Sequence, residues 1–121
     1  SIQGLFVMAL LVFTQTSNAD TVEVRCVGPV GSGTSVSGEL ILLERQDSTF
    51  EASGVLVAKV AGEELELDVK GMYDTVGGEY AVVGALNNEN IQLIYLNFTD
   101  DEESSISYIE YKSEQYPMTC Q

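Results

Sequence analysis

The stretch ELELDVKG, residues 64–71, alternates strictly between apolar and charged side chains. Successive side chains of an extended chain point to opposite faces, so Leu65, Leu67 and Val69 share one face. The other face takes the charged residues Glu64, Glu66, Asp68 and Lys70. This alternation is typical of a β-strand that packs on a core on one side and meets water on the other.

The same pattern recurs through the chain after Ala19. In TVEVRCV, residues 21–27, apolar side chains alternate with Glu23 and Arg25. About eight such short segments follow one another, with turn signals roughly every 8–12 residues and no apolar repeat at helical spacing. We therefore predict one all-β domain over residues 20–121. Its antiparallel strands form mainly a meander and a closed or nearly closed barrel, with a β-sandwich as the alternative.

Two segments depart from simple alternation. The run LILL, residues 40–43, is apolar at every position and predicts a strand that is covered on both faces or lies at a sheet crossing. Gly54 interrupts the long segment TFEASGVLVAKV, residues 49–60, and predicts a bend or bulge where one strand serves two sheets or turns a barrel corner.

The first nineteen residues are typical of a secretory signal peptide. An apolar run of about ten residues, Gly4 to Phe13, precedes Ser17-Asn18-Ala19, whose small residues suit cleavage before Asp20. The basic region of such a signal is missing or lies upstream of Ser1. The run is too short to span a bilayer, which needs about 20 apolar residues, and a buried core helix is the alternative. We expect an exported protein, periplasmic or extracellular, with no membrane span.

The two cysteines lie near the two ends of the predicted domain. In an oxidising compartment Cys26 and Cys120 are expected to form a disulfide, because redox-active pairs usually sit close together in sequence. A disulfide requires the two Cα atoms to lie within about 7 Å. It would therefore bring the first and last strands together, which favours a closed barrel.

Composition excludes several chemistries. The 121 residues contain 19 Asp and Glu, 5 Lys and Arg and no His, which gives a formal charge of −14. Such a charge repels nucleic acid and attracts cationic partners; the alternative is that it only keeps an exported protein soluble. The absence of His removes Ser-His-Asp triads and imidazole zinc sites, so we expect no catalytic site, no cofactor and no metal centre. The acidic segment Asp100–Glu103 lacks the spacing of a calcium-binding loop, and calcium binding there is left open.

The segment GMYDTVGGEY, residues 71–80, is the strongest candidate for a recognition loop. It is long for a hairpin, rich in glycine, and places Met72 and Tyr73 beside Asp74 and Glu79. An exposed aromatic residue flanked by acids suits a cationic partner, whereas packing in or at the rim of the core is the alternative for the tyrosines of this chain. We predict binding through these four residues.

These features predict an exported non-catalytic binding protein, an acidic barrel that recognises a basic protein partner through its loops. An inhibitor of a basic hydrolase, such as a lysozyme-type enzyme, fits the charge and the compartment. The alternative is a carrier that holds a small apolar ligand or lipid inside the barrel, because eight strands can enclose either a cavity or a packed core.

Overall fold

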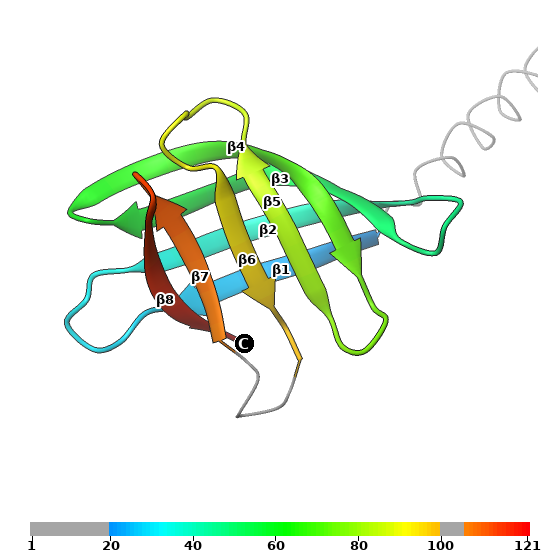
Figure 1. Ribbon diagram of the computed structural model, residues 1–121, viewed down its shortest axis with the longest axis horizontal. Helices are drawn as coiled ribbons and strands as arrows, with labels where there is room; N and C mark the ends of the chain where they lie inside the picture. Colours follow the sequence, from blue (N-terminus) through cyan, green and yellow to red (C-terminus); the bar gives the residue numbers. More distant parts are fainter. Residues whose placement is uncertain (1–19, 100–105) are drawn as a thin grey trace, which may run out of the picture.

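The computed structural model describes residues 20–99 and 106–121 (Figure 1). Their strands form one closed antiparallel barrel in which each strand pairs with the next along the chain, in the order β1 to β8. The strands are β1 (Asp20–Val27), β2 (Ser35–Glu44), β3 (Phe50–Val60), β4 (Glu63–Asp74), β5 (Tyr80–Ala85), β6 (Leu93–Asn97), β7 (Ile106–Tyr111) and β8 (Glu114–Cys120). The predicted all-β meander barrel is confirmed, and the described residues contain no helix.

Two of the hairpins turn within two residues. Ala61 and Gly62 join β3 to β4 with φ angles of 51° and 80°, and Lys112 and Ser113 join β7 to β8 with 51° and 68°. Positive φ at both central positions is the geometry whose twist matches that of the flanking strands. Lys112 and Ser113 adopt this left-handed conformation without the help of a glycine, which is unfavourable for residues with a Cβ atom.

The barrel closes where its ends meet. β1 pairs with β8 at only two positions, Cys26 with Cys120 and Val27 with Thr119. A disulfide joins Cys26 to Cys120, whose Cα atoms lie 4.0 Å apart. The predicted bond is thus confirmed, and it reinforces the shortest seam of the barrel.

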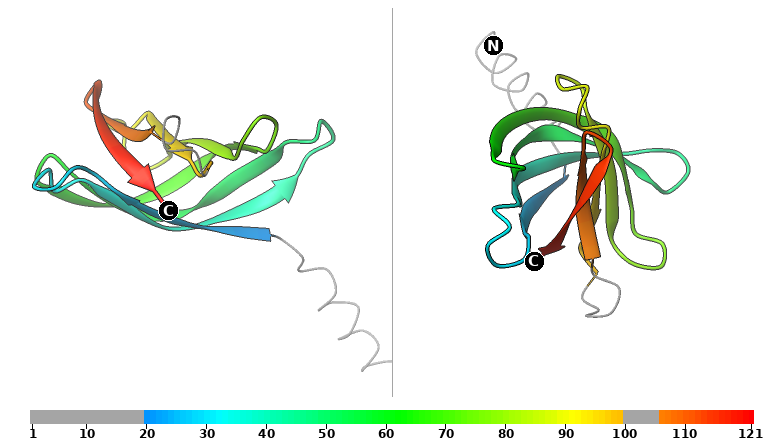
Figure 2. Two further views of the ribbon diagram at one scale, coloured as in Figure 1. Left: turned by 90° about the horizontal axis from the view of Figure 1, so that it is seen from below. Right: turned by 60° about the vertical axis from the view of Figure 1, so that its left-hand side comes forward.

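The barrel is flattened into two walls (Figure 2). The long strands β1–β4 make one curved wall, and the shorter strands β5–β8 make the other. Inward side chains from both walls pack into a single core. Its largest fully buried members include Leu40, Leu56, Leu67, Ile94, Leu96 and Ile109.

The run of residues 40–43 is covered on one face only. Leu40 and Leu42 are buried, whereas Ile41 and Leu43 expose 42% and 52% of their surface. The prediction of a strand covered on both faces is therefore wrong. The reason is that β2 lies in a single-layered barrel wall, with no second element outside it.

Gly54 lies in the middle of β3 and allows two strands to approach closely. A Cβ atom added there would lie 2.3 Å from the carbonyl oxygen of Glu39. The pairing of β3 with β2 and β4 runs without interruption through Leu40–Gly54 and Gly54–Val69. Of the predicted bend or bulge, the bulge is therefore wrong, because the glycine accommodates a neighbouring backbone within a regular ladder, and the bend stays a prediction.

Two predictions fall on residues outside the described ranges: the signal peptide at residues 1–19 and the acidic segment Asp100–Glu103. Within the described ranges, no helix is long and apolar enough to cross a membrane.

Candidate functional site: an acidic outer face

The candidate recognition loop begins later than predicted, because β4 continues through Met72 and Tyr73 to Asp74. The inward series of Leu67 and Val69 skips Gly71 and resumes at Tyr73. Met72 therefore points outward and is 42% exposed, whereas Tyr73 points inward and is 6% exposed. The prediction of an exposed aromatic residue at position 73 is wrong.

Tyr73 belongs to an aromatic cluster inside one end of the barrel. Its ring lies 5.9 Å from that of Phe50, edge to face, and 6.4 Å from that of Phe98. Burial, followed by the charge of the Glu79 carboxylate and a hydrogen bond to it, raises the pKa of the Tyr73 phenol. Glu79, which lies in the loop between β4 and β5, thus interacts with a tyrosine of the core.

The acids of this segment organise the turn between β4 and β5. The Asp74 carboxylate accepts a hydrogen bond from the Val76 N–H (2.9 Å), and Thr99 Oγ1 accepts one from the Glu79 N–H (2.9 Å). An open depression of about 370 Å³ adjoins them, lined by Thr75, Gly78, Glu79, Phe98 and Thr99. The structure thus brings Asp74 and Glu79 to one end of the barrel and separates Met72 from Tyr73. Binding through these residues stays a prediction.

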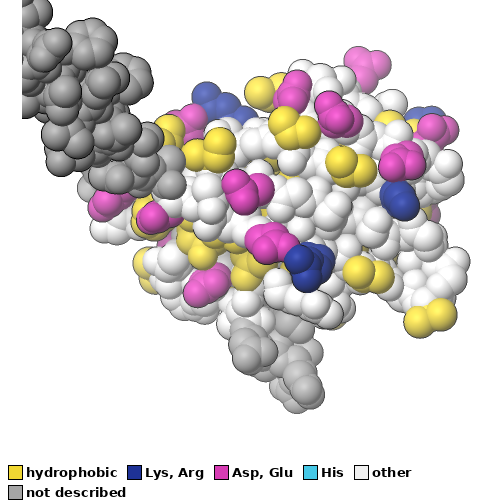
Figure 3. All heavy atoms as spheres, turned by 180° about the vertical axis from the view of Figure 1, so that it is seen from behind, with side chains coloured by type: hydrophobic (Ala, Val, Ile, Leu, Met, Phe, Trp, Pro, Cys, Tyr) yellow, Lys and Arg dark blue, Asp and Glu magenta, His cyan; other side chains and the backbone are white. Residues whose placement is uncertain are grey.

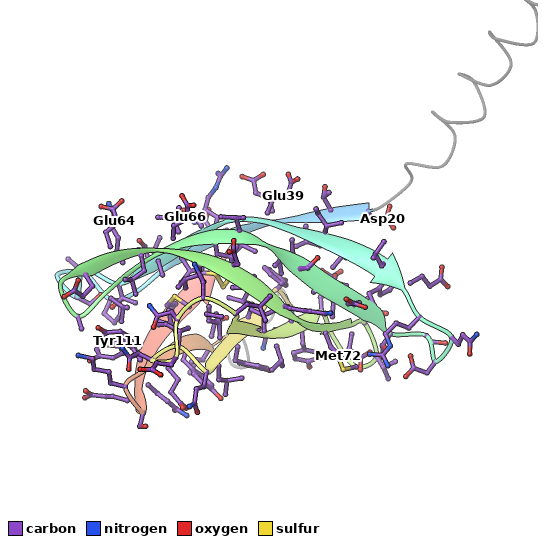
Figure 4. The ribbon with its side chains drawn as sticks, turned by 90° about the horizontal axis from the view of Figure 1, so that it is seen from above. Asp20, Glu39, Glu64, Glu66, Met72 and Tyr111 are labelled. Atoms are coloured by element: carbon purple, nitrogen blue, oxygen red, sulfur yellow. A yellow bond between two sulfur atoms is a disulfide. The ribbon has the colours of Figure 1, made fainter. Side chains whose placement is uncertain are left out.

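A second set of acids lies on the outer side of the β1–β4 wall. We call it the acidic outer face, and it comprises Glu23, Glu39, Glu64, Glu66 and Asp68. All five residues are exposed. Figure 3 shows Asp and Glu side chains spread over this wall among apolar ones, and Figure 4 shows Glu39, Glu64 and Glu66 along its outer side.

Strand register brings acids from distant parts of the sequence together. Glu23 of β1 lies directly opposite Glu39 of β2, and Asp68 of β4 lies opposite Val55, the β3 neighbour of Glu39. Like charges directly opposite each other in a sheet repel. The ion pair of Glu23 with Arg25 offsets part of this repulsion, and a bound cation would relieve the rest.

The bases on this wall neutralise only part of the charge. In the described part of the chain there are two ion pairs, Arg25 with Glu23 and Lys70 with Glu51. The Lys70 Nζ lies 3.2 Å from the Glu51 carboxylate. The carboxylates of Glu39, Glu66 and Asp68 are in neither pair, so they are available to an outside cation.

The edge of β4 beneath these acids is held by the side chain of Asn87. Its Oδ1 accepts a hydrogen bond from the Asp68 N–H (2.9 Å), and its Nδ2 donates to the Glu66 carbonyl (3.1 Å). The Leu86 N–H also donates to the Asp68 carbonyl (2.7 Å). These contacts continue the sheet where β5 has ended, and they fix the backbone that carries two of the acids.

The opposite wall has a different character. Tyr80, Tyr95 and Tyr108 project outward from β5, β6 and β7, with ring centroids 6.2 Å and 5.6 Å apart. Burial, and then the neighbouring phenols, raise the pKa of Tyr95. Met72 and Val82 continue this row at neighbouring register positions. The outer surface of the barrel therefore has an acidic wall and an aromatic wall.

Neither wall has the features of a metal or nucleophile site. Among the described residues, no group of three or more His, Cys, Asp or Glu side chains is placed to hold a metal ion, and no cysteine is free. Comparisons of the chain with protein-family models, with curated proteins and with solved structures find no match. The site therefore has to be judged from its own chemistry.

The sequence analysis identified the outward acids of β4 but missed their neighbours in β1 and β2. The alternation in each segment shows that Glu23 and Glu39 point outward. It does not show that these two residues are paired, because cross-strand register depends on turn geometry as well as on the pattern.

Proposed function

We propose that this chain is an exported, non-catalytic binding protein that captures a cationic protein on its acidic outer face. The observation that carries the proposal is the register that sets Glu39 beside Glu23 and brings Asp68 to the same wall. Oriented carboxylates on a rigid sheet attract a basic partner over a distance and fix its orientation. An inhibitor of a basic hydrolase is one protein of this kind.

Two features of the molecule support a binding role on the outer surface. All eight strands contribute inward side chains to one hydrophobic core, which favours recognition on the outer walls and the loops. No observation favours the alternative of an internal lipid carrier. The disulfide is compatible with an oxidising compartment, where an exported partner would be met.

The test compares two variants that change the net charge equally. The first removes three acids of the face (Glu39→Gln, Glu66→Gln, Asp68→Asn), and the second removes three acids outside it (Glu89→Gln, Glu110→Gln, Glu114→Gln). Binding to immobilised lysozyme, pancreatic ribonuclease and cytochrome c, all basic proteins, is measured at increasing salt. Three exposed charge contacts of about 0.5 kcal/mol each amount to about 1.5 kcal/mol, or about tenfold in affinity.

We expect the face variant to bind about tenfold more weakly and the control variant to bind within about threefold of wild type. Affinity should fall with added salt for wild type and less steeply for the face variant. Equal losses in the two variants would show that net charge, and not this face, drives binding. No binding to any of the basic proteins would refute the proposal.

A further inference from the structure

β1 has a neighbour on only one side over most of its length. All eight of its residues pair with β2, but only Cys26 and Val27 pair with β8. Figure 1 shows β1 running on past the point where β8 ends. Among residues 20–99 and 106–121, nothing pairs with the other edge of β1 from Asp20 to Val24.

The backbone groups on this edge can be assigned. The Arg25 carbonyl accepts a hydrogen bond from the Gln121 N–H (3.0 Å), so Arg25 directs its polar groups toward the β8 side. Alternate residues of a strand direct their N–H and C=O groups to the same edge. Thr21 and Glu23 therefore present two donors and two acceptors at the spacing that another strand requires.

The other free edge of the seam, that of β8, is protected. Pro117 lies within β8 and has no N–H to offer. The loop after β1 also covers this edge, because Gly28 lies so close that an added Cβ atom would be 3.1 Å from the Pro117 carbonyl oxygen. The segment Asp20–Val24 of β1 contains no proline, and no described residue pairs with its free edge.

The side chains beside the open edge define what would fit it. On the outer face, a strand added there would place its side chains next to Glu23, with Glu39 one strand further. On the inner face, its side chains would lie next to Val22, which packs against the core, and Val24, which is buried, with Asp20 at the end of the same row. The matching strand alternates basic and apolar residues over about five positions.

We propose that the free edge of β1 binds an extended segment of a cationic partner by β-strand addition. Main-chain hydrogen bonds to Thr21 and Glu23 would hold the segment. The carboxylate of Glu39, together with that of Glu23, which already forms an ion pair with Arg25, would select its basic side chains. The inference rests on the proposed function, because it assigns a docking mode to the same acidic wall. A second copy of this chain fits the edge poorly, since pairing β1 with itself would add Glu23 and Glu39 of the copy to an already acidic edge.

The probe is the capped peptide Val-Lys-Val-Lys-Val, with binding measured by isothermal titration calorimetry on the disulfide-bonded protein. Thr21→Pro removes an edge N–H and leaves the groups that face β2 in place, while Thr21→Val keeps the N–H and serves as the control. Two further peptides carry backbone N-methyl groups, one on its lysines and the other on its valines. In an added strand, either the lysine N–H groups or the valine N–H groups face β1, so only one of the two peptides loses the hydrogen bonds to β1.

We expect Thr21→Pro to weaken peptide binding at least tenfold and Thr21→Val to change it less than twofold. One N-methylated peptide should lose binding at least tenfold, and the other should bind within about threefold of the parent. The peptide comparison uses wild-type protein, so it decides the question even where Thr21→Pro impairs folding.

Equal binding of both N-methylated peptides would overturn strand addition. The proposed function would then still stand if basic proteins bound in a salt-dependent way and the face variant lost that binding. A sedimentation experiment that finds a wild-type dimer and a Thr21→Pro monomer would assign the edge to a second copy, and this too would overturn the inference. Failure of both the peptide and the basic proteins to bind would refute the docking mode and the function together.

Discussion

The disulfide is predicted to supply a large part of the stability of the barrel. Cys26 and Cys120 are 94 residues apart in sequence. In the chain-entropy relation, closing a loop of this length in the unfolded state stabilises the fold by about 4.7 kcal/mol. Domains of this size are stable by about 5–15 kcal/mol in total, so the double variant Cys26→Ala/Cys120→Ala should be close to its unfolding threshold.

Strand pairing offers little compensation at this seam. β1 and β8 share two register pairs, so the loss of the disulfide leaves the closure of the barrel to a short contact. The assay is urea unfolding followed by circular dichroism, with reduced wild type as a control that keeps the cysteine side chains in place. We expect the reduced protein and the double variant to lose similar free energies of unfolding, about 3–5 kcal/mol. A loss below about 1 kcal/mol in both would refute the idea that the disulfide constrains the barrel.

Three further predictions concern single positions, and each is measured by urea unfolding. Gly71→Ala should lower the free energy of unfolding by about 2 kcal/mol or more, because the added Cβ atom would lie 1.9 Å from the Val82 carbonyl oxygen. A decrease below about 0.5 kcal/mol would contradict the close contact between β4 and β5 at this position. Ser113→Gly should stabilise by about 1 kcal/mol, because Ser113 has a φ of 68°, and a loss of stability would contradict this. The raised pKa of Tyr73 means that the folded state holds the phenol proton more tightly than the unfolded state does. The protonated phenol therefore contributes to the free energy of unfolding below about pH 10, and this contribution is lost as the pH rises through the pKa of the folded state. Wild type should therefore lose stability as the pH rises above about 10, and Tyr73→Phe should lose less over the same range. Equal losses in the two proteins would assign the alkaline loss to other groups.

Much of the fold is predictable from alternation and the two cysteines. Leu65, Leu67 and Val69 face the core as their spacing indicates, and Cys26 and Cys120 are paired. The inward orientation of the leucines and valine depends only on local alternation, and the disulfide involves the only two cysteines of the sequence. Both features can therefore be predicted from a single sequence.

The failures come from features that depend on neighbours. Ile41 is apolar and exposed, because a single-layered wall leaves one face of each strand to solvent whatever the side chain. Tyr73 continues the inward series of β4, but Gly71 interrupts the series, and a Gly next to an acidic, Gly-rich segment resembles the start of a loop. The alternation of inward and outward residues along β4 is thus enough to predict that Tyr73 points inward.

The candidate site was the hardest part to predict. That Glu23 and Glu39 point outward follows from alternation, but their pairing depends on the loop between β1 and β2. The open edge of β1 is set by where β8 ends relative to Cys26, which is a property of the closed barrel and not of any segment.

An NMR titration tests the central claim most directly. Amide resonances of the ¹⁵N-labelled protein are followed while an unlabelled basic protein from the binding panel is added, first at low salt and then at high salt. If the acidic outer face captures the partner, the largest shifts fall on Glu23, Glu39, Glu66 and Asp68 and reverse with salt. Shifts that centre on the wall of Tyr80, Tyr95 and Tyr108, or that persist at high salt, would contradict the account.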